Sequence, residues 1–478
     1  MSDYEPVVGM ECHAELLTES KMFCGCANHF GGEPNTRCCP VCLGMPGSLP
    51  VPNKKAVEHV IKASLALNCS ITTNARFDRK NYFYPDLPKG YQISEYEDPI
   101  GARGWMDIEV DGVTKRIRIR RVHLEEDTGK LSHTASNDSE VDLNRAGVPL
   151  MEIVTEFPPD IHSSAEARAY LIKLRSILTY LEVCDGKMEQ GSLRCEPNVS
   201  VKQKGSDIFG TKTEIKNLNS FRAVMRGIDY EVERQIALLN RGEKVMQETR
   251  GWNEAKQSTY SQRSKEVEQE YRYFPDPDLM PLLITEEWIQ EIRASMPELP
   301  DAKKLRFMEQ YRIPRDDASQ LTETRALADY YETAAASSDP KMIANWMMGD
   351  LSRLMNADGK EITECPVSAP QLAAMVGMIE RGDISGKLAK VLIERMYATG
   401  EDPDKIAQRE GLIVLKDSSV LSAAVDAVFA ANASVVSDII DKGLVNKRGF
   451  LVGQIMKATG GKADPADVNR LLDEKLKA

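Results

Sequence analysis

Residues 105–120 read WMDIEVDGVTKRIRIR, and this stretch decides the fold of the first half of the chain. Two runs with the alternation of a β-strand flank Asp111-Gly112, a dipeptide that suits a type I′ turn. The sequence therefore predicts a β-hairpin whose second strand carries a basic run at 115–121.

An acidic octapeptide, HLEEDTGK at 123–130, follows the basic strand directly. Carboxylates packed this closely repel one another, so they persist in a folded site only if they are solvated, paired with cations or bound to a metal. The octapeptide alone favours a solvated acidic turn, and other motifs have to decide. Its titratable residues before the lysine are His123, Glu125, Glu126 and Asp127.

Composition describes an ordinary globular protein, with 42% hydrophobic and 28% charged residues. A chain of 478 residues predicts two or three domains. The net charge of −12 argues against nucleic-acid binding driven by overall charge, although the basic run at 115–121 can contact phosphate locally. No apolar run approaches the ~18 residues of a membrane helix. We therefore expect a cytoplasmic protein without a membrane segment.

The order of sequence patterns predicts an α+β fold in three parts. Residues 1–294 mix strands with helices such as 163–183, which begins with a capping-box pattern. Residues 295–405 carry helical segments joined by short polar turns, and residues 406–478 form a compact helical tail.

A cluster of cysteines near the N-terminus predicts a metal site. Six of the ten cysteines fall in the first 42 residues, where C-x-C at Cys24 and Cys26 precedes C-x-x-C at Cys39 and Cys42. Two close pairs around a Gly/Pro-containing loop suit a tetrahedral Cys₄ zinc site of structural type. Cys38 is an alternative ligand to Cys39, and four unrelated buried thiols are the other interpretation.

Several acidic residues stand in strand-like surroundings. Glu11 and His13 are two residues apart, so a strand would present both on one face. Glu152 and Glu214 lie within apolar runs, where a lone carboxylate is costly unless it is paired or ligating. Together they suit Mg²⁺ and phosphoryl transfer, whereas each alone is more typical of a surface or salt-bridged acid. The sequence has no P-loop, no G-x-G-x-x-G fingerprint and no H-E-x-x-H. The residues alone thus indicate a metal-using α+β enzyme.

A series of longer segments resembles the GatB family, the B subunits of aspartyl/glutamyl-tRNA amidotransferases. The resemblance runs from about residue 5 to the C-terminus and includes a tail similar to the family's YqeY-like tRNA-binding domain. The segments, in order, are GMECHAEL, FDRKNYFYPDLPKGYQIS, HLEEDTGK, DLNRAGVPLMEIVTE, MEQGSLRCEPNVSV, TEIKNLNSF and YRYFPDPDL.

The resemblance implies a large cradle-like catalytic domain of mixed sheet and a reaction on misacylated tRNA. ATP and Mg²⁺ activate the side-chain carboxylate of the tRNA-borne Glu or Asp, and ammonia then forms the amide. The ammonia comes from a glutaminase subunit, GatA, and the small subunit GatC holds the two together. The implied catalytic residues are Glu125, Glu126, Glu152, Lys80 and Lys89, and the implied magnesium ligands are Glu11, His13, Glu125, Glu126, Glu152 and Glu214.

Two positions depart from the family pattern. Glu196 stands where many members have aspartate, and Glu95 stands where glutamine is expected. The extra methylene at Glu196 changes its reach, so no ligand role is assigned to it.

Two other functions remain open. A zinc-stabilised RNA-binding protein without catalysis would tolerate alanine at Glu125 or Glu152. A metallohydrolase acting on a phosphoester would be active without a partner subunit or an acyl acceptor.

Overall fold

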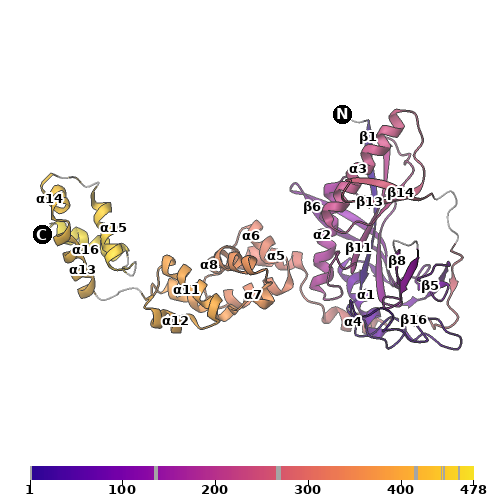
Figure 1. Cartoon of the computed structure of the whole chain (residues 1–478), viewed down its shortest axis with the longest axis horizontal. Coiled ribbons are helices and arrows are strands. Elements are labelled where there is room, and N and C mark those ends of the chain that lie inside the picture. The colour runs from indigo at the N-terminus through magenta and orange to yellow at the C-terminus, as the bar shows by residue number, and fades with distance from the viewer. Residues whose placement is uncertain are drawn as a thin grey trace. The chain divides into compact units, whose positions relative to one another are not determined.

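The computed structural model describes residues 3–133, 138–264, 271–413, 418–442, 444, 447–460, 463 and 465–477. It divides the chain into two compact units, Met1–Leu299 and Pro300–Ala478. The first unit mixes strands and helices, and each named element in the described residues of the second is a helix, which confirms the α+β class (Figure 1). The first unit ends a few residues after the boundary predicted at 294.

The hairpin predicted around Asp111-Gly112 is present. Strand β6 (Gly101–Val110) pairs with β7 (Val113–Glu126), and Val110 lies opposite Val113. Asp111 has φ of 51° and Gly112 has φ of 77°, the left-handed conformations that a two-residue turn of this type requires. Strand β7 is long enough to carry both the basic run and the first part of HLEEDTGK.

A twelve-stranded sheet forms the body of the first unit. Its main path runs β14-β13-β12-β11-β1-β10-β7-β5-β4-β15, with β6 also pairing β7 and β2 pairing β6. The pair β12–β13 is parallel and the other pairs in this sheet are antiparallel, so the sheet is mixed. The remaining strand bounds are β1 Tyr4–Glu15, β2 Ser70–Ile71, β3 Asn74–Ala75, β4 Asp78–Asn81, β5 Tyr91–Ser94, β8 Lys130–His133, β9 Ser139–Asp142, β10 Pro149–Thr155, β11 Leu193–Gln203, β12 Thr213–Lys216, β13 Glu248–Asn253, β14 Ser258–Ser264, β15 Phe274–Pro275 and β16 Leu282–Leu283.

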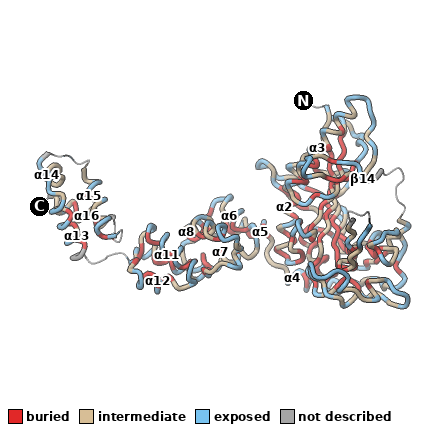
Figure 2. The backbone as a smooth tube through the Cα atoms, in the orientation of Figure 1, coloured by how far each residue is buried: buried red, intermediate tan, exposed pale blue. Residues whose placement is uncertain are grey.

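Helices pack on one face of this sheet and leave the other face for polar groups. The helices are α1 (Lys54–Ala66), α2 (Ser164–Tyr180), α3 (Phe221–Asn240) and α4 (Glu286–Ala294). Their apolar residues share one core with alternate residues of the strands, which Figure 2 shows as red tube. Helix α2 begins where the capping box predicts, because Ser163 Oγ accepts a hydrogen bond from Glu166 N at 3.1 Å.

The second unit contains two apolar cores. One is built from buried residues within 307–412 and the other from buried residues within 421–472. Taken one at a time, the described helices are too short or too polar to span a bilayer, whereas the bent pair Leu421–Ala431 and Ala433–Asp441 has the required length and composition when the two are taken together. The helices are α5 Pro300–Gln310, α6 Arg315–Leu321, α7 Arg325–Ala335, α8 Pro340–Trp346, α9 Ser352–Asp358, α10 Ala369–Glu380, α11 Gly386–Thr399, α12 Pro403–Glu410, α13 Ser418–Ala431, α14 Ala433–Lys442, α15 Arg448–Ala458 and α16 Pro465–Lys477, with a π turn at Met347–Leu351 and a 3₁₀ turn at Ile362–Glu364.

Candidate metal and active site

Strand alternation in the centre of the sheet sorts apolar from polar side chains. On β1, Met10, Cys12 and Ala14 are buried in the core that the helices cover. Glu11 and His13 therefore point to the opposite face, as their spacing predicts. The same alternation operates on β7, β10 and β11, so their polar residues share that face.

Cross-strand register then brings a histidine and two glutamates together. Glu152 on β10 lies opposite both His13 on β1 and His123 on β7. The ligand atoms of His13, Glu125 and Glu152 lie within 4.8 Å of one another. His13 Nε2 is 3.8 Å from Glu125 Oε1 and 3.9 Å from Glu152 Oε2.

His123 and Ser94 hold the two carboxylates in place. His123 Nε2 lies 3.0 Å from Glu152 Oε2, and Ser94 Oγ donates a hydrogen bond to Glu125 Oε2 at 3.1 Å. Burial by itself lowers the pKa of His123, but the Glu152 and Glu125 carboxylates outweigh it and raise that pKa to about 9. Burial raises the pKa of Glu152, yet His123 and His13 hold it below its usual range. Both carboxylates are thus kept ionised although they are buried.

A second cluster, of Glu11, Glu196 and Glu214, lies farther along the same face. Register places Glu11 opposite Glu196, and places Asn198 opposite Glu214. Burial and the surrounding carboxylates of Glu152, Glu214 and Glu196 raise the pKa of Glu11, so this cluster has an excess of negative charge.

Three neighbours satisfy the oxygens of this second cluster. Asn198 Nδ2 donates to Glu11 Oε1 at 2.8 Å, and Thr249 Oγ1 donates to Glu214 Oε2 at 2.7 Å. Lys216 Nζ lies 2.7 Å from Glu196 Oε2 and 3.2 Å from Glu214 Oε1. An ammonium therefore neutralises part of the charge, and a metal ion here would share the carboxylates with it.

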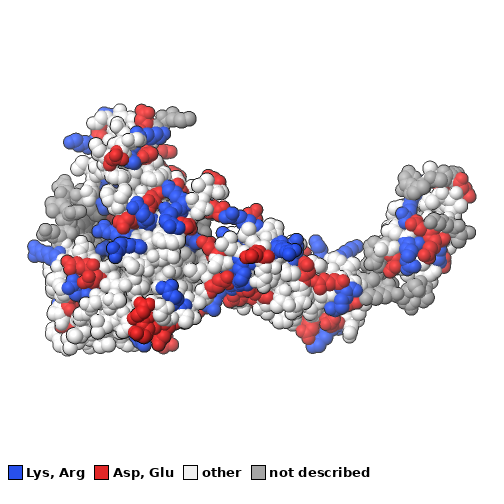
Figure 3. Space-filling model, turned by 180° about the vertical axis from the view of Figure 1, so that it is seen from behind, with Lys and Arg blue, Asp and Glu red and all other residues white. Residues whose placement is uncertain are grey.

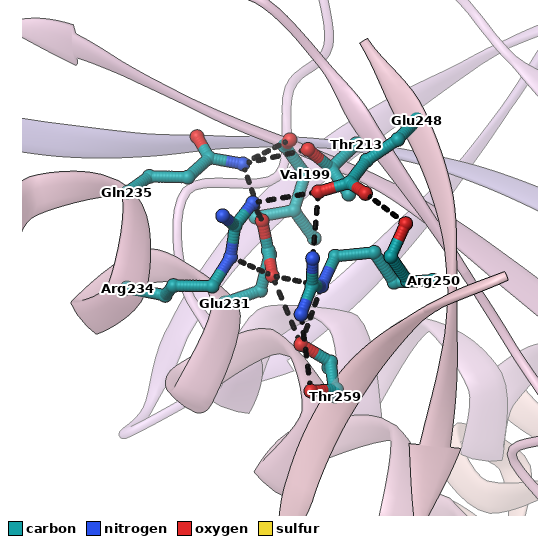
Figure 4. A network of polar contacts seen from close by, with 9 residues as sticks. Val199, Thr213, Glu231, Arg234, Gln235, Glu248, Arg250 and Thr259 are labelled. Carbon is teal, nitrogen blue, oxygen red and sulfur yellow. Dashed lines mark hydrogen bonds and ion pairs between the residues drawn. The ribbon is translucent and has the colours of Figure 1, made fainter. Parts of the chain in front are cut away.

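A buried polar network positions the strands that carry Glu214 and Thr249 (Figure 4). Glu231 on α3 accepts hydrogen bonds from Arg234 Nη2 at 2.6 Å and from Gln235 Nε2 at 2.9 Å. Gln235 also donates to Val199 O on β11 and to Thr213 Oγ1 on β12. Helix α3 is thus hydrogen-bonded to β11 and β12 from the face of the sheet opposite the second cluster.

The same network continues into β13 and β14. Arg250 Nη1 lies 2.6 Å from Glu248 Oε1, and Arg250 Nε donates to Thr259 Oγ1 at 2.8 Å. Thr259 Oγ1 in turn lies 3.4 Å from Glu231 Oε2. Because β12 and β13 form the parallel pair of the sheet, these side chains hold the register that places Thr249 beside Glu214.

Glu126 and Lys89 lie apart from both clusters. Glu126 follows Glu125 on β7, so its side chain leaves the strand on the other face. Its carboxylate pairs with the Lys89 ammonium and accepts a hydrogen bond from Ile93 N at 3.0 Å. The structure therefore does not bring Glu126 into one ligand set with Glu125, because neighbouring strand residues face opposite ways.

Lys80 interacts electrostatically with the carboxylates of the first cluster. Burial by itself lowers the pKa of Lys80, but the charges of Glu125 and Glu152 raise it above its usual range. A half-buried cation is thus kept charged beside the two carboxylates. Its Nζ also lies 5.0 Å from the centre of the Tyr271 ring, a cation–π contact.

Arg194 reaches across the same face to Asp127. Arg194 lies opposite His13 in the sheet, yet its Nη2 donates to Asp127 Oδ2, at the end of β7, at 2.7 Å. Burial raises the pKa of Asp127, but Arg194 and Arg145 hold it below its usual range. The final acid of the HLEEDTGK motif is therefore a structural partner of an arginine.

The predicted cysteine site forms with the predicted ligands. The sulfurs of Cys24, Cys26, Cys39 and Cys42 lie within 4.8 Å of one another, and Cys38 is not among them. Cys39 Sγ lies 3.8 Å from Cys42 Sγ, and Cys39 N lies 3.1 Å from Cys42 Sγ. Bonds of ~2.3 Å to a tetrahedral ion place sulfurs about 3.8 Å apart, so this cluster is able to hold a metal.

The first cluster also suits a metal ion. One imidazole nitrogen and two ionised carboxylates on adjacent strands are ligands that a divalent cation accepts. Glu196 and His123 are named in the sequence analysis, but neither is assigned a role in the site there. The alternation Arg194, Glu196, Asn198 in RCEPNVSV is a signal that would have placed Glu196 on the polar face.

An acidic, histidine-bearing face on a mixed sheet, joined to a helical unit, defines this chain as an α+β enzyme with a candidate metal site. A model of the GatB/GatE catalytic domain matches residues 6–290, and one of the GatB domain matches residues 329–476. The second match begins well before the tail predicted at 406–478.

Proteins named as the B subunit of aspartyl/glutamyl-tRNA(Asn/Gln) amidotransferase are similar over the whole chain. The one from Carboxydothermus hydrogenoformans is 54% identical, covering 100% of this chain and 99% of its own length. Those from Thermoanaerobacter sp. and Brevibacillus brevis are 52% and 51% identical, with coverage of 99% or more on both sides. The chain therefore belongs to the GatB/GatE family of amidotransferase subunits, and the predicted resemblance is confirmed.

Proposed function

We propose that this chain activates the side-chain carboxylate of Glu or Asp on misacylated tRNA with ATP, as the GatB component of a tRNA-dependent amidotransferase. The product is Gln-tRNA(Gln), Asn-tRNA(Asn) or both. The relatives that are similar to this chain over its whole length are named as the B subunit of such an amidotransferase. The observation that carries the proposal is the sheet face on which His13, Glu125 and Glu152 converge beside a second cluster of glutamates.

The chemistry requires two displacements. A carboxylate oxygen of the aminoacyl group attacks the γ-phosphorus of ATP, the bond to ADP breaks, and an acyl phosphate forms. Ammonia then attacks the acyl carbon, phosphate leaves with the bonding electrons, and a proton is lost to give the amide. The first step is needed because a carboxylate otherwise has no adequate leaving group.

The sheet face would hold Mg²⁺ through His13, Glu125 and Glu152, and, at the second cluster, through Glu11 and Glu214 with Glu196. Bound magnesium supplies charge neutralisation for the phosphates of ATP. The chain's own contribution is to orient these ligands before substrate arrives. Lys80 adds a fixed positive charge beside the first cluster.

Lys89 and Glu126 take a different place in this proposal. Their ion pair faces away from the metal ligands, so they do not contact the phosphoryl group. Lys89 lies 5.7 Å from the ring centres of both Phe23 and Tyr91, which surround its ammonium. We therefore place this pair outside the proposed magnesium site.

The partners in this proposal are those that the family resemblance implies. Ammonia comes from glutamine hydrolysed by a GatA subunit, with GatC joining the subunits, and the complex works in the cytoplasm. The cysteine cluster binds zinc and stabilises the fold. On the face seen in Figure 3, Lys and Arg lie among Asp and Glu, which favours tRNA recognition by shape and local contacts over one broad basic surface.

The test is release of phosphate from ATP by the purified three-subunit complex. We expect release to require misacylated tRNA and to fall at least about 100-fold in Glu125→Gln, because a neutral amide neither balances the buried His123 nor binds a cation well. Glu109→Gln, on an exposed residue of β6, is the matched control and should keep full activity.

Two results would contradict the proposal. Equal release with deacylated tRNA would indicate a hydrolase acting on ATP or another phosphoester. Full amidation by Glu125→Gln would show that the acidic residues of this face have a structural role only, and it would favour an RNA-binding protein without catalysis.

A further inference from the structure

Lys21 is a fully buried lysine beside the cysteine cluster. Its side chain has 0% exposure. Its Nζ lies 2.8 Å from Arg37 O, 3.3 Å from Leu143 O and 3.8 Å from Cys42 Sγ. An ammonium without water is costly unless it is hydrogen-bonded and paired with negative charge. Of these three acceptors, only the Cys42 sulfur can carry a full charge.

Four thiolates and one divalent ion carry a net charge of −2, which is unfavourable in a half-buried loop. Groups behind the ligands that donate to them commonly decide how tightly such a site holds its metal. Lys21 is placed for this task, because it donates to one ligand from inside the protein while the loop closes over it.

Lys21 also connects the cysteine loop to the chain that leads into β10. Its second acceptor, Leu143 O, belongs to residues 141–147, which end just before that strand. The loop is held against this segment by further bonds. Arg37 N donates to Asn144 Oδ1 at 2.8 Å, and Met22 N donates to Gly147 O at 2.7 Å. Strand β10 carries Glu152, so the loop supports a strand of the active face.

We propose that Lys21 is the internal counter-ion of the four-cysteine metal site. Its ammonium offsets the charge of the metal-bound thiolates and fastens the loaded loop to residues 141–147. This inference rests on the zinc assignment proposed above, but not on the amidotransferase reaction.

The experiment measures zinc affinity of the full-length chain by chelator competition, and the melting temperature with and without zinc. Lys21→Gln keeps a hydrogen-bond donor but loses the charge. We expect its zinc affinity to fall roughly 10–100-fold. Without zinc, the variant should melt no lower than the wild type, because an uncompensated ammonium no longer has to be buried. Lys55→Gln removes an exposed lysine of α1 and should change neither quantity.

A lysine with a merely structural role gives a different pattern. It predicts an equal fall in melting temperature in both states and unchanged zinc affinity, which would overturn the proposal. Lys21→Met, which keeps the length of the side chain, is measured in parallel. Failure of both variants to fold without zinc would also overturn it, since the metal-free chain is expected to tolerate the loss. If the wild type itself binds no zinc, the zinc assignment is wrong, and the proposal for Lys21 is overturned with it.

Discussion

The buried network around Glu231 provides a sharp test of how the sheet is held. Glu231 has 0% exposure, and its carboxylate lies 2.6 Å from Arg234 Nη2 and 3.7 Å from Arg250 Nε. Glu231→Gln keeps the shape of the side chain but leaves these two guanidinium groups with the carboxylate of Glu248, whose Oε1 lies 3.6 Å from Arg234 Nη2 and 2.6 Å from Arg250 Nη1. Breaking a buried pair in this way costs about 3–5 kcal/mol. Both arginines keep this second partner and some contact with solvent, so we expect the lower end, about 3 kcal/mol.

That loss converts into a measurable shift of the melting transition. In a unit of this size, 1 kcal/mol corresponds to about 2 °C, so calorimetry should show the first unit melting about 6 °C lower. Glu243→Gln is the matched control. Its pair with Arg241 has the same 2.6 Å separation but is exposed, so its loss should leave the melting temperature unchanged. Equal shifts for the two variants would refute the argument that burial, and not distance, sets the contribution of these pairs.

Three further outcomes are expected. Cys39→Ser should lose bound zinc by metal analysis, whereas Cys38→Ser should retain it, and the reverse would exchange their roles. Burial raises the pKa of Glu95 to about 8, so the folded state holds a proton that the unfolded state loses above pH 4.5. Stability therefore falls as the pH rises from about 4.5 to 8, and Glu95→Gln should remove this slope from thermal melts. Asp127→Asn should lower the melting temperature at neutral pH, with the difference vanishing in acid as the wild-type carboxylate protonates; a constant difference at every pH would contradict its pairing with Arg194.

Local chemistry in the sequence was sufficient for the hairpin, the start of α2 and the four cysteines. Asp111-Gly112 specifies its turn through backbone conformations that few residue pairs adopt. The cysteine pairs likewise lie close together in sequence, so spacing alone predicts their convergence.

The division of the acidic residues into two clusters could not be predicted in this way. It depends on which strands are neighbours, and β1 pairs with β10 and β11, which are far away in sequence. The separation of Glu125 from Glu126 was predictable in principle, because strand residues alternate, but only once the strand was known to continue through both. Glu196 was given no ligand role because its side chain is one methylene longer than that of aspartate, whereas the strand register places it directly opposite Glu11.

The central position of β1 has a consequence for how the molecule is made. Its residues are synthesised about 180–200 residues before their partners on β11, which include Leu193 and Gln203. At about 5–20 residues per second, synthesis reaches them only after roughly 10–40 s. Until β10 is made, an apolar strand bearing Met10, Cys12 and Ala14 has no sheet to join, and for the rest of the interval one of its two edges stays unpaired. Nascent chains of this protein are therefore expected to depend on chaperones until the second neighbour of β1 emerges.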